Sequence, residues 1–186
     1  MALSIASTPP LWGGYETWSS LVNMTNPADS LEHPEWKFDY FFDQPNSREL
    51  YIHRAGQGDE VCKKIAVDAE ECRVLNVDGK AYISNVETGE CCHQMGWMIR
   101  DDWLTSCGAT YNDTITELNG EAVNLWQCSG NYLNNYVDTV DGNEPVRFFE
   151  HKGDLLKQWD FVRDSFKAGE VDETLFEIPE DCPKMC

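Results

Sequence analysis

The chain has 186 residues, which is enough for one well-filled hydrophobic core and short for two. Its 33 acidic and 14 basic side chains give a formal net charge of -19, which argues against nucleic acid and against an anionic membrane surface as partners. Such acidity is typical of a protein kept soluble in a salty or calcium-containing medium, and a partner with a basic face or loosely bound divalent cations would also match it.

Residues 1–35 have a mixed pattern. Tyr15, Trp18 and Leu21 are spaced as on a helix, but a strand over residues 15–23 fits equally well. We treat residues 1–35 as an N-terminal extension that packs on a domain formed by residues 36–186. The first ten residues lack the basic start and long apolar core of a complete signal peptide, so a secreted protein would be present here in a mature or truncated form. No stretch reaches the roughly 18 apolar residues of a membrane span, so no transmembrane segment is expected.

From residue 36 onward, apolar and polar side chains alternate. This pattern predicts a half-buried strand over residues 36–43, and a strand over 49–53 that pairs with it as an antiparallel hairpin. The most specific local pattern is Asp78-Gly79, the favoured pair for a tight two-residue turn, which predicts a hairpin of strands 72–77 and 80–84.

Turns recur about every ten residues through the rest of the chain, as in an all-β meander. Further strands are predicted over residues 61–67, 91–98, 110–117, 122–127, 132–138 and 146–149. Asp101 is predicted to cap one short helical turn, and no helix of four or more turns is expected. The fold class is therefore all-β with a minor helical part, in one domain.

The cysteines are even in number and more frequent than in an ordinary cytosolic domain: Cys62, Cys72, Cys91, Cys92, Cys107, Cys128, Cys182 and Cys186. The last two are the pair nearest to zinc-ligand spacing, and no second pair completes such a site, so disulfides fit better than zinc. Disulfides indicate an oxidising space, either extracellular or in a lumen. The sequons at Asn23 and Asn112 would permit glycosylation there.

Several motifs follow one another within residues 36–186: Cys91-Cys92, Asp102-Trp103-Leu104, Tyr111, Leu118-Asn119-Gly120, Leu125-Trp126, Tyr136, Pro145-Val146, Trp159-Asp160-Phe161 and the ending Phe176-Glu177-Ile178-Pro179-Glu180-Asp181-Cys182. Their order resembles that of ependymin-related proteins, and of similar protist domains that stand alone or precede papain-like proteases.

The resemblance implies a twisted antiparallel sheet curled into a half-barrel, as in bacterial lipoprotein carriers, with short helices closing the open side and disulfides stapling the fold. It also implies secretion, calcium responsiveness, a homodimer in some members and a deep apolar pocket for lipid-like molecules. The chain departs from the animal members because it has no cysteine before Cys62 and has an additional pair, Cys107 and Cys128.

The adjacent cysteines Cys91 and Cys92 cannot easily bond to each other without straining the peptide between them, so each should reach a different segment. On spacing alone, we expect the two to bond to Cys182 and Cys186. The remaining four would then form the local bridges Cys62–Cys72 and Cys107–Cys128, among the many pairings that eight cysteines allow.

A set of aromatic residues could line the apolar cavity of a curled sheet, or could pack against each other as an ordinary core. This candidate pocket consists of Trp36, Phe38, Tyr40, Phe42, Tyr82, Trp97, Trp103, Trp126, Tyr136 and Trp159.

Oxygen ligands for calcium are available at Asp138, Asp141 and Asn143, with Glu144 and Asp78 as further candidates. They do not follow the spacing of a helix–loop–helix calcium site, and turn formation explains the same residues. For catalysis, the suggestive neighbours are Cys92-His93 and Cys107-Gly108, and all eight cysteines can be used in disulfides. We therefore expect no enzyme activity and no required cofactor.

These observations predict a secreted or lumenal binding protein that holds a hydrophobic or amphipathic small molecule of lipid or pigment type. The alternative is a structural or accessory subunit, without a ligand, that docks through exposed aromatic side chains in a larger assembly. A hollow concave face would favour the first role, and exposed tryptophan or tyrosine on the convex face would favour the second.

Overall fold

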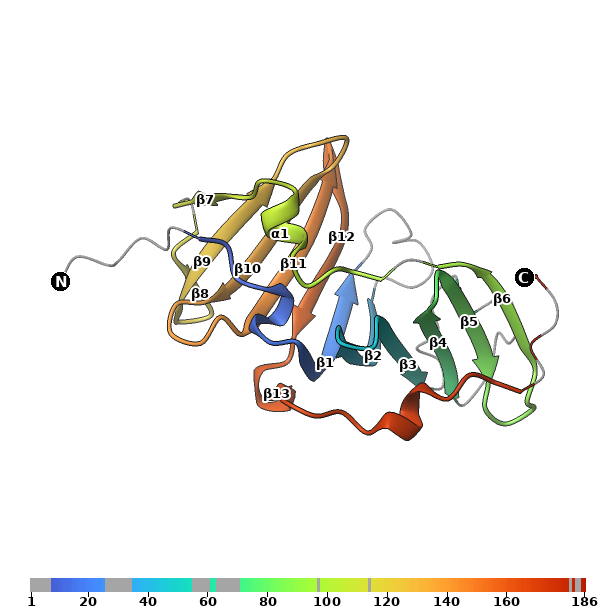
Figure 1. The fold of residues 1–186 in the computed structure, drawn as a ribbon. Coiled ribbons are helices and arrows are strands. Elements are labelled where there is room, and N and C mark those ends of the chain that lie inside the picture. The colour runs from blue at the N-terminus through green and yellow to red at the C-terminus, as the bar shows by residue number, and fades with distance from the viewer. Residues whose placement is uncertain are drawn as a thin grey trace.

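The structure is a computed structural model that describes residues 8–25, 35–54, 61–62, 71–96, 98–113, 115–180, 182 and 185–186. Within these residues, thirteen strands form one antiparallel sheet that is not closed into a barrel (Figure 1). The predicted fold class, an all-β half-barrel with little helix, is confirmed. None of the helices in this part of the chain is long and apolar enough to cross a membrane.

The strands form two consecutive groups along the chain. The first group is β1 (Thr17–Thr25), β2 (Glu35–Asp43), β3 (Arg48–Arg54), β4 (Glu71–Val77), β5 (Lys80–Asn85) and β6 (Cys91–Met95). The second is β7 (Thr110–Asn112), β8 (Glu117–Leu118), β9 (Glu121–Cys128), β10 (Leu133–Thr139), β11 (Pro145–Lys152), β12 (Asp154–Phe161) and β13 (Lys167–Ala168). The helical segments are η1 (Trp12–Gly14), α1 (Trp103–Ser106), η4 (Arg163–Ser165) and η5 (Glu173–Phe176).

The two groups are joined at the middle of the sheet, where the first strand pairs with a late one. The strand order is β6-β5-β4-β3-β2-β1-β12-β11-β10-β9-β7, with β13 on β1 and β8 on β9. Figure 1 shows the segment between β6 and α1 returning across the sheet, so that α1 and η1 lie over the half formed by β9 to β12.

Two hairpins follow directly from their turn residues. Asp78 and Gly79 have φ angles of 51° and 73°, and Asn119 and Gly120 have 55° and 83°. Both central residues of such a turn need a positive φ, which Asp, Asn and Gly tolerate best. The hairpin predicted at Asp78-Gly79 is confirmed by the pairing of β4 with β5.

Several predicted boundaries are wrong. Val61 and Cys62 lie in a turn, and the rest of the strand predicted over 61–67 falls outside the described residues. The segment 110–117 splits into β7 and β8, and β12 forms where no strand was predicted. The residue that caps α1 is Asp102 and not Asp101; its side chain makes no capping hydrogen bond.

The assignment of residues 1–35 to an extension also differs from what is seen. Residues 17–25 form β1, which pairs along its length with β2 and over its second half with β12. Alternate residues of β1 face the core, so that Trp18 and Val22 are fully buried. This segment is therefore a central strand of the sheet.

Trp12 lies at the centre of the main hydrophobic core and is fully buried. Its ring lies 5.2 to 6.4 Å, between centroids, from six other aromatic rings: Trp18, Trp103, Tyr136, Phe148, Trp159 and Phe161. Its backbone N–H donates to the carbonyl of Asp101 at 2.8 Å, so η1 is tied to the segment that precedes α1. Gly13 follows with φ 69°, and a Cβ there would lie 2.2 Å from the Trp18 ring.

The opposite face of the first group is covered by the C-terminal segment. Leu50 and Ile52 of β3 form a second core with Leu75 and Phe176, the last residue of η5. The guanidinium of Arg48 lies 4.4 Å from the centre of the Phe176 ring. Both faces of β3 are thus buried.

The four disulfides are Cys62–Cys72, Cys91–Cys182, Cys92–Cys186 and Cys107–Cys128, which confirms the predicted pairing. The backbone N–H of Cys186 also donates to the carbonyl of His93 at 3.0 Å. The C-terminus is therefore fixed to the edge strand β6, where it covers part of an otherwise unpaired edge.

The bridges Cys91–Cys182 and Cys92–Cys186 close almost the same loop. Replacing either pair by alanine should lower the free energy of unfolding by about 2 kcal/mol, because the remaining bridge keeps the long loop closed. Replacing both pairs should lower it by about 6 to 7 kcal/mol, more than the sum, as measured by urea unfolding. Replacing Cys62 and Cys72 together with either pair should instead be additive. A loss of about 4 kcal/mol on removing both long-range bridges would contradict this account.

The substitution Trp12→Ala should lower the free energy of unfolding by about 3 to 5 kcal/mol, because it leaves a cavity that six surrounding rings cannot fill. Tyr132→Ala is the matched control: Tyr132 is 40% exposed, and its loss should cost less than about 1 kcal/mol. Equal effects of the two substitutions, measured by denaturant titration, would show that Trp12 is not central to the core.

Candidate functional site

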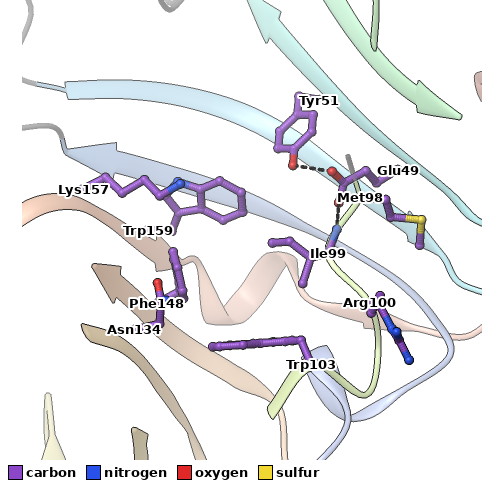
Figure 2. A pocket seen from close by; sticks show the side chains of 10 residues that line it. All are labelled: Glu49, Tyr51, Met98, Ile99, Arg100, Trp103, Asn134, Phe148, Lys157 and Trp159. Carbon is purple, nitrogen blue, oxygen red and sulfur yellow. Dashed lines mark hydrogen bonds between the residues drawn. The ribbon is translucent and has the colours of Figure 1, made fainter. Parts of the chain in front are cut away.

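A pocket of about 340 Å³, partly open to solvent, lies beside the main aromatic core (Figure 2). Its walls come from strands β3, β10, β11 and β12 and from the segment 98–103, which crosses the sheet. The lining side chains are Glu49, Tyr51, Met98, Ile99, Arg100, Trp103, Asn134, Phe148, Lys157 and Trp159.

The alternation of side chains along the strands places the lining residues on one face. Glu49 and Tyr51 are two residues apart on β3, so both point to the concave side while Leu50 points to the other. On the facing wall, Phe148 of β11 is directly opposite Trp159 of β12, with ring centroids 5.8 Å apart in an edge-to-face arrangement. Such aromatic pairs provide a firm apolar surface.

The segment 98–103 forms the remaining wall and is held at three points. The Ile99 N–H donates to Glu49 at 3.4 Å, and the Asp101 carbonyl accepts from Trp12. Trp103 begins α1 and contacts the Phe148 ring edge-on at a centroid distance of 6.0 Å. Figure 2 shows Ile99, Trp103, Phe148 and Trp159 facing a common space.

Glu49 lines the pocket and is a fully buried carboxylate, 1% exposed. It accepts hydrogen bonds from four groups: the hydroxyls of Tyr40 and Tyr51, both at 2.8 Å, the Asn76 amide at 2.9 Å and the Ile99 N–H. No arginine or lysine pairs with it among the described residues. Burial raises its pKa to about 7, although the tyrosine hydroxyls act in the opposite direction.

The same carboxylate is connected to the centre of the core. Tyr40 donates to Glu49 and accepts from the indole N–H of Trp12 at 3.2 Å. Burial, together with the nearby Glu49 charge, raises the pKa of Tyr40 well above its ordinary value, so this hydroxyl remains a donor. Glu49 therefore links β3, the N-terminal segment and the pocket wall.

Two cations line the pocket. Arg100 is neutralised by Asp102, with two hydrogen bonds of 2.8 and 2.7 Å. The Lys157 ammonium lies 5.7 Å from the centre of the Phe148 ring and 5.8 Å from that of Trp159. No carboxylate of the described residues lies within 4.0 Å of it.

Of the ten aromatic residues proposed for the pocket, Trp103 and Trp159 line it. Five others belong to the packed core: Phe38, Tyr40, Phe42, Trp126 and Tyr136. Trp36 is buried outside this cluster, Tyr82 packs against the second core, and Trp97 lies outside the described residues. The ordinary-core interpretation therefore holds for most of the set.

The polar residues of the pocket, Glu49, Arg100, Asn134 and Lys157, were not predicted from the sequence. Glu49 and Tyr51 share one face of a predicted strand, and this alternation was the available indication that Glu49 points inward. Phe148 lay in a predicted strand, whereas Lys157 lay in a segment with no assigned structure. Met98, Ile99 and Arg100 belong to an irregular crossing segment, for which no periodicity exists.

The two aspartates proposed for calcium, Asp138 and Asp141, have different surroundings. Asp138 is fully buried and accepts a hydrogen bond from the indole N–H of Trp126 at 3.0 Å, whereas Asp141 is exposed on the following turn. Burial raises the pKa of Asp138 to about 7. Within the described ranges, no group of three or more histidine, cysteine or acidic side chains is placed to hold a metal ion.

The remaining candidate residues have structural surroundings of their own. All eight cysteines are in disulfides, so neither Cys92 nor Cys107 offers a free thiol. Asn23 lies within the central strand β1, and its amide oxygen is buried. Asn112 lies on β7, where its amide donates to Gln127. Glycosylation at both sequons stays a prediction.

Comparison with known proteins gives a relationship of fold. No family model matches the chain, and no curated protein matches it. Among solved structures, it is similar to an uncharacterized conserved protein from Thermus thermophilus, with a TM-score of 0.55. The two chains are 12% identical, and the match covers 91% of this chain and 89% of the other. At this identity, the similarity establishes the fold alone.

The raised pKa of Glu49 predicts a pH-dependent stability. Between about pH 4.5 and 7, the folded protein keeps a proton on Glu49 that the unfolded chain releases. The stability that this bound proton contributes is therefore complete below about pH 4.5 and is lost as the pH rises through 7. Between pH 4.5 and 8, the free energy of unfolding of the wild type should therefore fall by about 3 kcal/mol, measured against that of Glu49→Gln at the same pH. The exposed Glu177→Gln variant should follow the wild type. If urea unfolding shows that the free energies of unfolding of the wild type and of Glu49→Gln differ by the same amount at every pH, the raised pKa of Glu49 is contradicted.

Proposed function

We propose that this protein is a non-enzymatic binding protein that holds one small apolar or amphipathic molecule in the pocket between Tyr51, Ile99, Trp103, Phe148 and Trp159. The observation that carries the proposal is a space of about 340 Å³ bordered by aromatic and aliphatic side chains beside an already packed core. Ligand pockets measure roughly 300–1,000 Å³, so this volume suits a single small molecule or a single acyl chain.

Binding in such a site is driven by the removal of apolar surface from water. Apolar surface removed from water contributes roughly 25 cal/mol per Å², and a few polar groups at the rim set the ligand's orientation. The walls are pre-organised by the hydrogen bonds from Trp12 to Asp101 and from Ile99 to Glu49, which reduces the ordering cost of binding. No reactive group is required for this role.

The four disulfides indicate an oxidising, non-cytosolic environment. We propose that this environment is the extracellular medium or a lumen through which the ligand is carried. The strongly acidic surface suits solubility in such a medium.

The alternative role, an accessory subunit that docks through exposed aromatic side chains, has less support. Every tryptophan in the described part of the chain is buried or half-buried. The exposed rings there are Tyr15 and Tyr132, at 37% and 40%, and Tyr132 is already covered by the Lys152 ammonium at 5.3 Å from its centre.

Native mass spectrometry of the protein from its natural source tests the proposal. We expect a discrete additional mass that is lost on denaturation and recovered by solvent extraction. The stripped protein should take this molecule up again, whereas Ile99→Trp should not, because the larger side chain fills the pocket.

Val86→Trp is the matched control, since it makes a similar change at a side chain that is 49% exposed, outside the pocket. It should bind like the wild type. A bare chain mass, together with no uptake of any apolar molecule by the stripped wild type, would refute the proposed function.

A further inference from the structure

The charges at the pocket carry an inference that rests on the proposed function and specifies the ligand. We infer that the ligand is an anionic amphiphile with a single apolar chain and a carboxylate head, as in a fatty acid. Its head would bind the Lys157 ammonium, and its chain would lie between Ile99, Trp103, Phe148 and Trp159.

The first argument is which of the cations that line the pocket are paired with carboxylates. All six arginines of the chain lie in described segments and each is paired with a carboxylate: Arg48, Arg54, Arg73, Arg100, Arg147 and Arg163. Lys157 has no such partner among the described residues, despite a net charge of -19. Among the described residues, Lys80 and Lys152 also lie over aromatic rings and form no ion pair, but both are exposed and neither lines this pocket. Lys157 is thus an uncompensated cation on an apolar wall.

The second argument is the position of Glu150. It is opposite Lys157 in the pairing of β11 with β12, on the same face of the sheet. The Lys157 ammonium nevertheless lies over Phe148 and Trp159. Among the ion pairs of the described residues, none joins Lys157 to Glu150, so the two charged groups are more than 4.0 Å apart. The cation is therefore directed along the aromatic wall, where a bound anion can reach it. Glu150 would weaken the binding of that anion by charge repulsion.

The third argument excludes a cationic ligand. A cationic ligand would need the other charged group of the pocket, Glu49. Four protein donors already occupy that carboxylate, whose two oxygens offer about four acceptor positions. Glu49 holds the pocket wall in place and has no acceptor position left for a ligand.

The fourth argument concerns the type of anion. One ammonium balances a single negative charge, and the amide of Asn134, which also lines the pocket, adds a neutral donor. A carboxylate matches this set, whereas a doubly charged phosphate would leave one charge unpaired beside apolar walls. The volume of about 340 Å³ limits the apolar part to one chain.

The test compares three probes of equal length with the ligand-free, full-length protein at pH 8: dodecanoic acid, dodecan-1-ol and dodecylamine, each below its micelle concentration. Binding is measured by calorimetry and by tryptophan fluorescence. We expect the acid to bind about tenfold more tightly than the alcohol, since its carboxylate forms a charge-assisted hydrogen bond with the Lys157 ammonium that the alcohol cannot form. The amine should bind most weakly.

Lys157→Gln should reduce affinity for the acid about tenfold and leave affinity for the alcohol unchanged. Glu150→Gln should leave affinity for the acid unchanged or increase it. Lys80→Gln is the matched control, because it removes the same charge from another lysine that lies over an aromatic ring, and it should change nothing.

The outcomes separate this inference from the proposed function. Equal binding of all three probes, unaffected by Lys157→Gln but abolished by Ile99→Trp, would overturn the carboxylate assignment and leave the binding function intact. Tighter binding of the amine than of the acid would likewise overturn the carboxylate assignment and leave the binding function intact. Failure of all three probes to bind would overturn the carboxylate assignment. It would overturn the proposed function as well only if the protein from its natural source also has a bare chain mass and the stripped protein takes up no apolar molecule.

Discussion

The hydrogen-bonded series from Trp12 through Tyr40 to Glu49 is the interaction on which the rest of the structure depends. An open curled sheet leaves its concave face exposed unless another part of the chain covers it. Here the indole of Trp12 enters that face and donates to Tyr40, which donates to Glu49. Glu49 in turn holds the Ile99 backbone. One buried carboxylate thereby fixes the relative positions of η1, β2, β3 and the crossing segment.

This arrangement explains why a pocket exists beside such a dense aromatic core. A buried carboxylate without a cationic partner is costly, and four hydrogen bonds offset that cost only if their donors are held in place. The requirement holds the Ile99 backbone beside β3, so Ile99 is kept from closing onto Phe148 and Trp159. The polar network keeps apart walls that hydrophobic burial alone would bring together.

Much of the fold was predictable from local patterns. Alternation identified β2 and β3, Asp78-Gly79 identified one hairpin, and the adjacent Cys91 and Cys92 indicated the two long-range disulfides. The central position of β1 was not predictable, because pairing between distant strands has no local sequence pattern. The residues of the pocket were harder still to predict from the sequence. An acidic residue on a strand normally faces water, so the face that Glu49 shares with Tyr51 on β3 was a weak indication beside the tertiary contacts that hold Glu49 inside.

The pairing of β1 with β12 has a consequence for the order of events during synthesis. Val22 pairs with Phe161, so one side of the central strand has no long partner until residues 23–160 have been made. A sheet of β1 to β6 without β12 has an open edge at β1, in the middle of the final strand order. Unpaired edges of this kind are where nascent chains associate with one another. The strand that organises the mature protein is therefore also the one most in need of protection while the polypeptide is still growing.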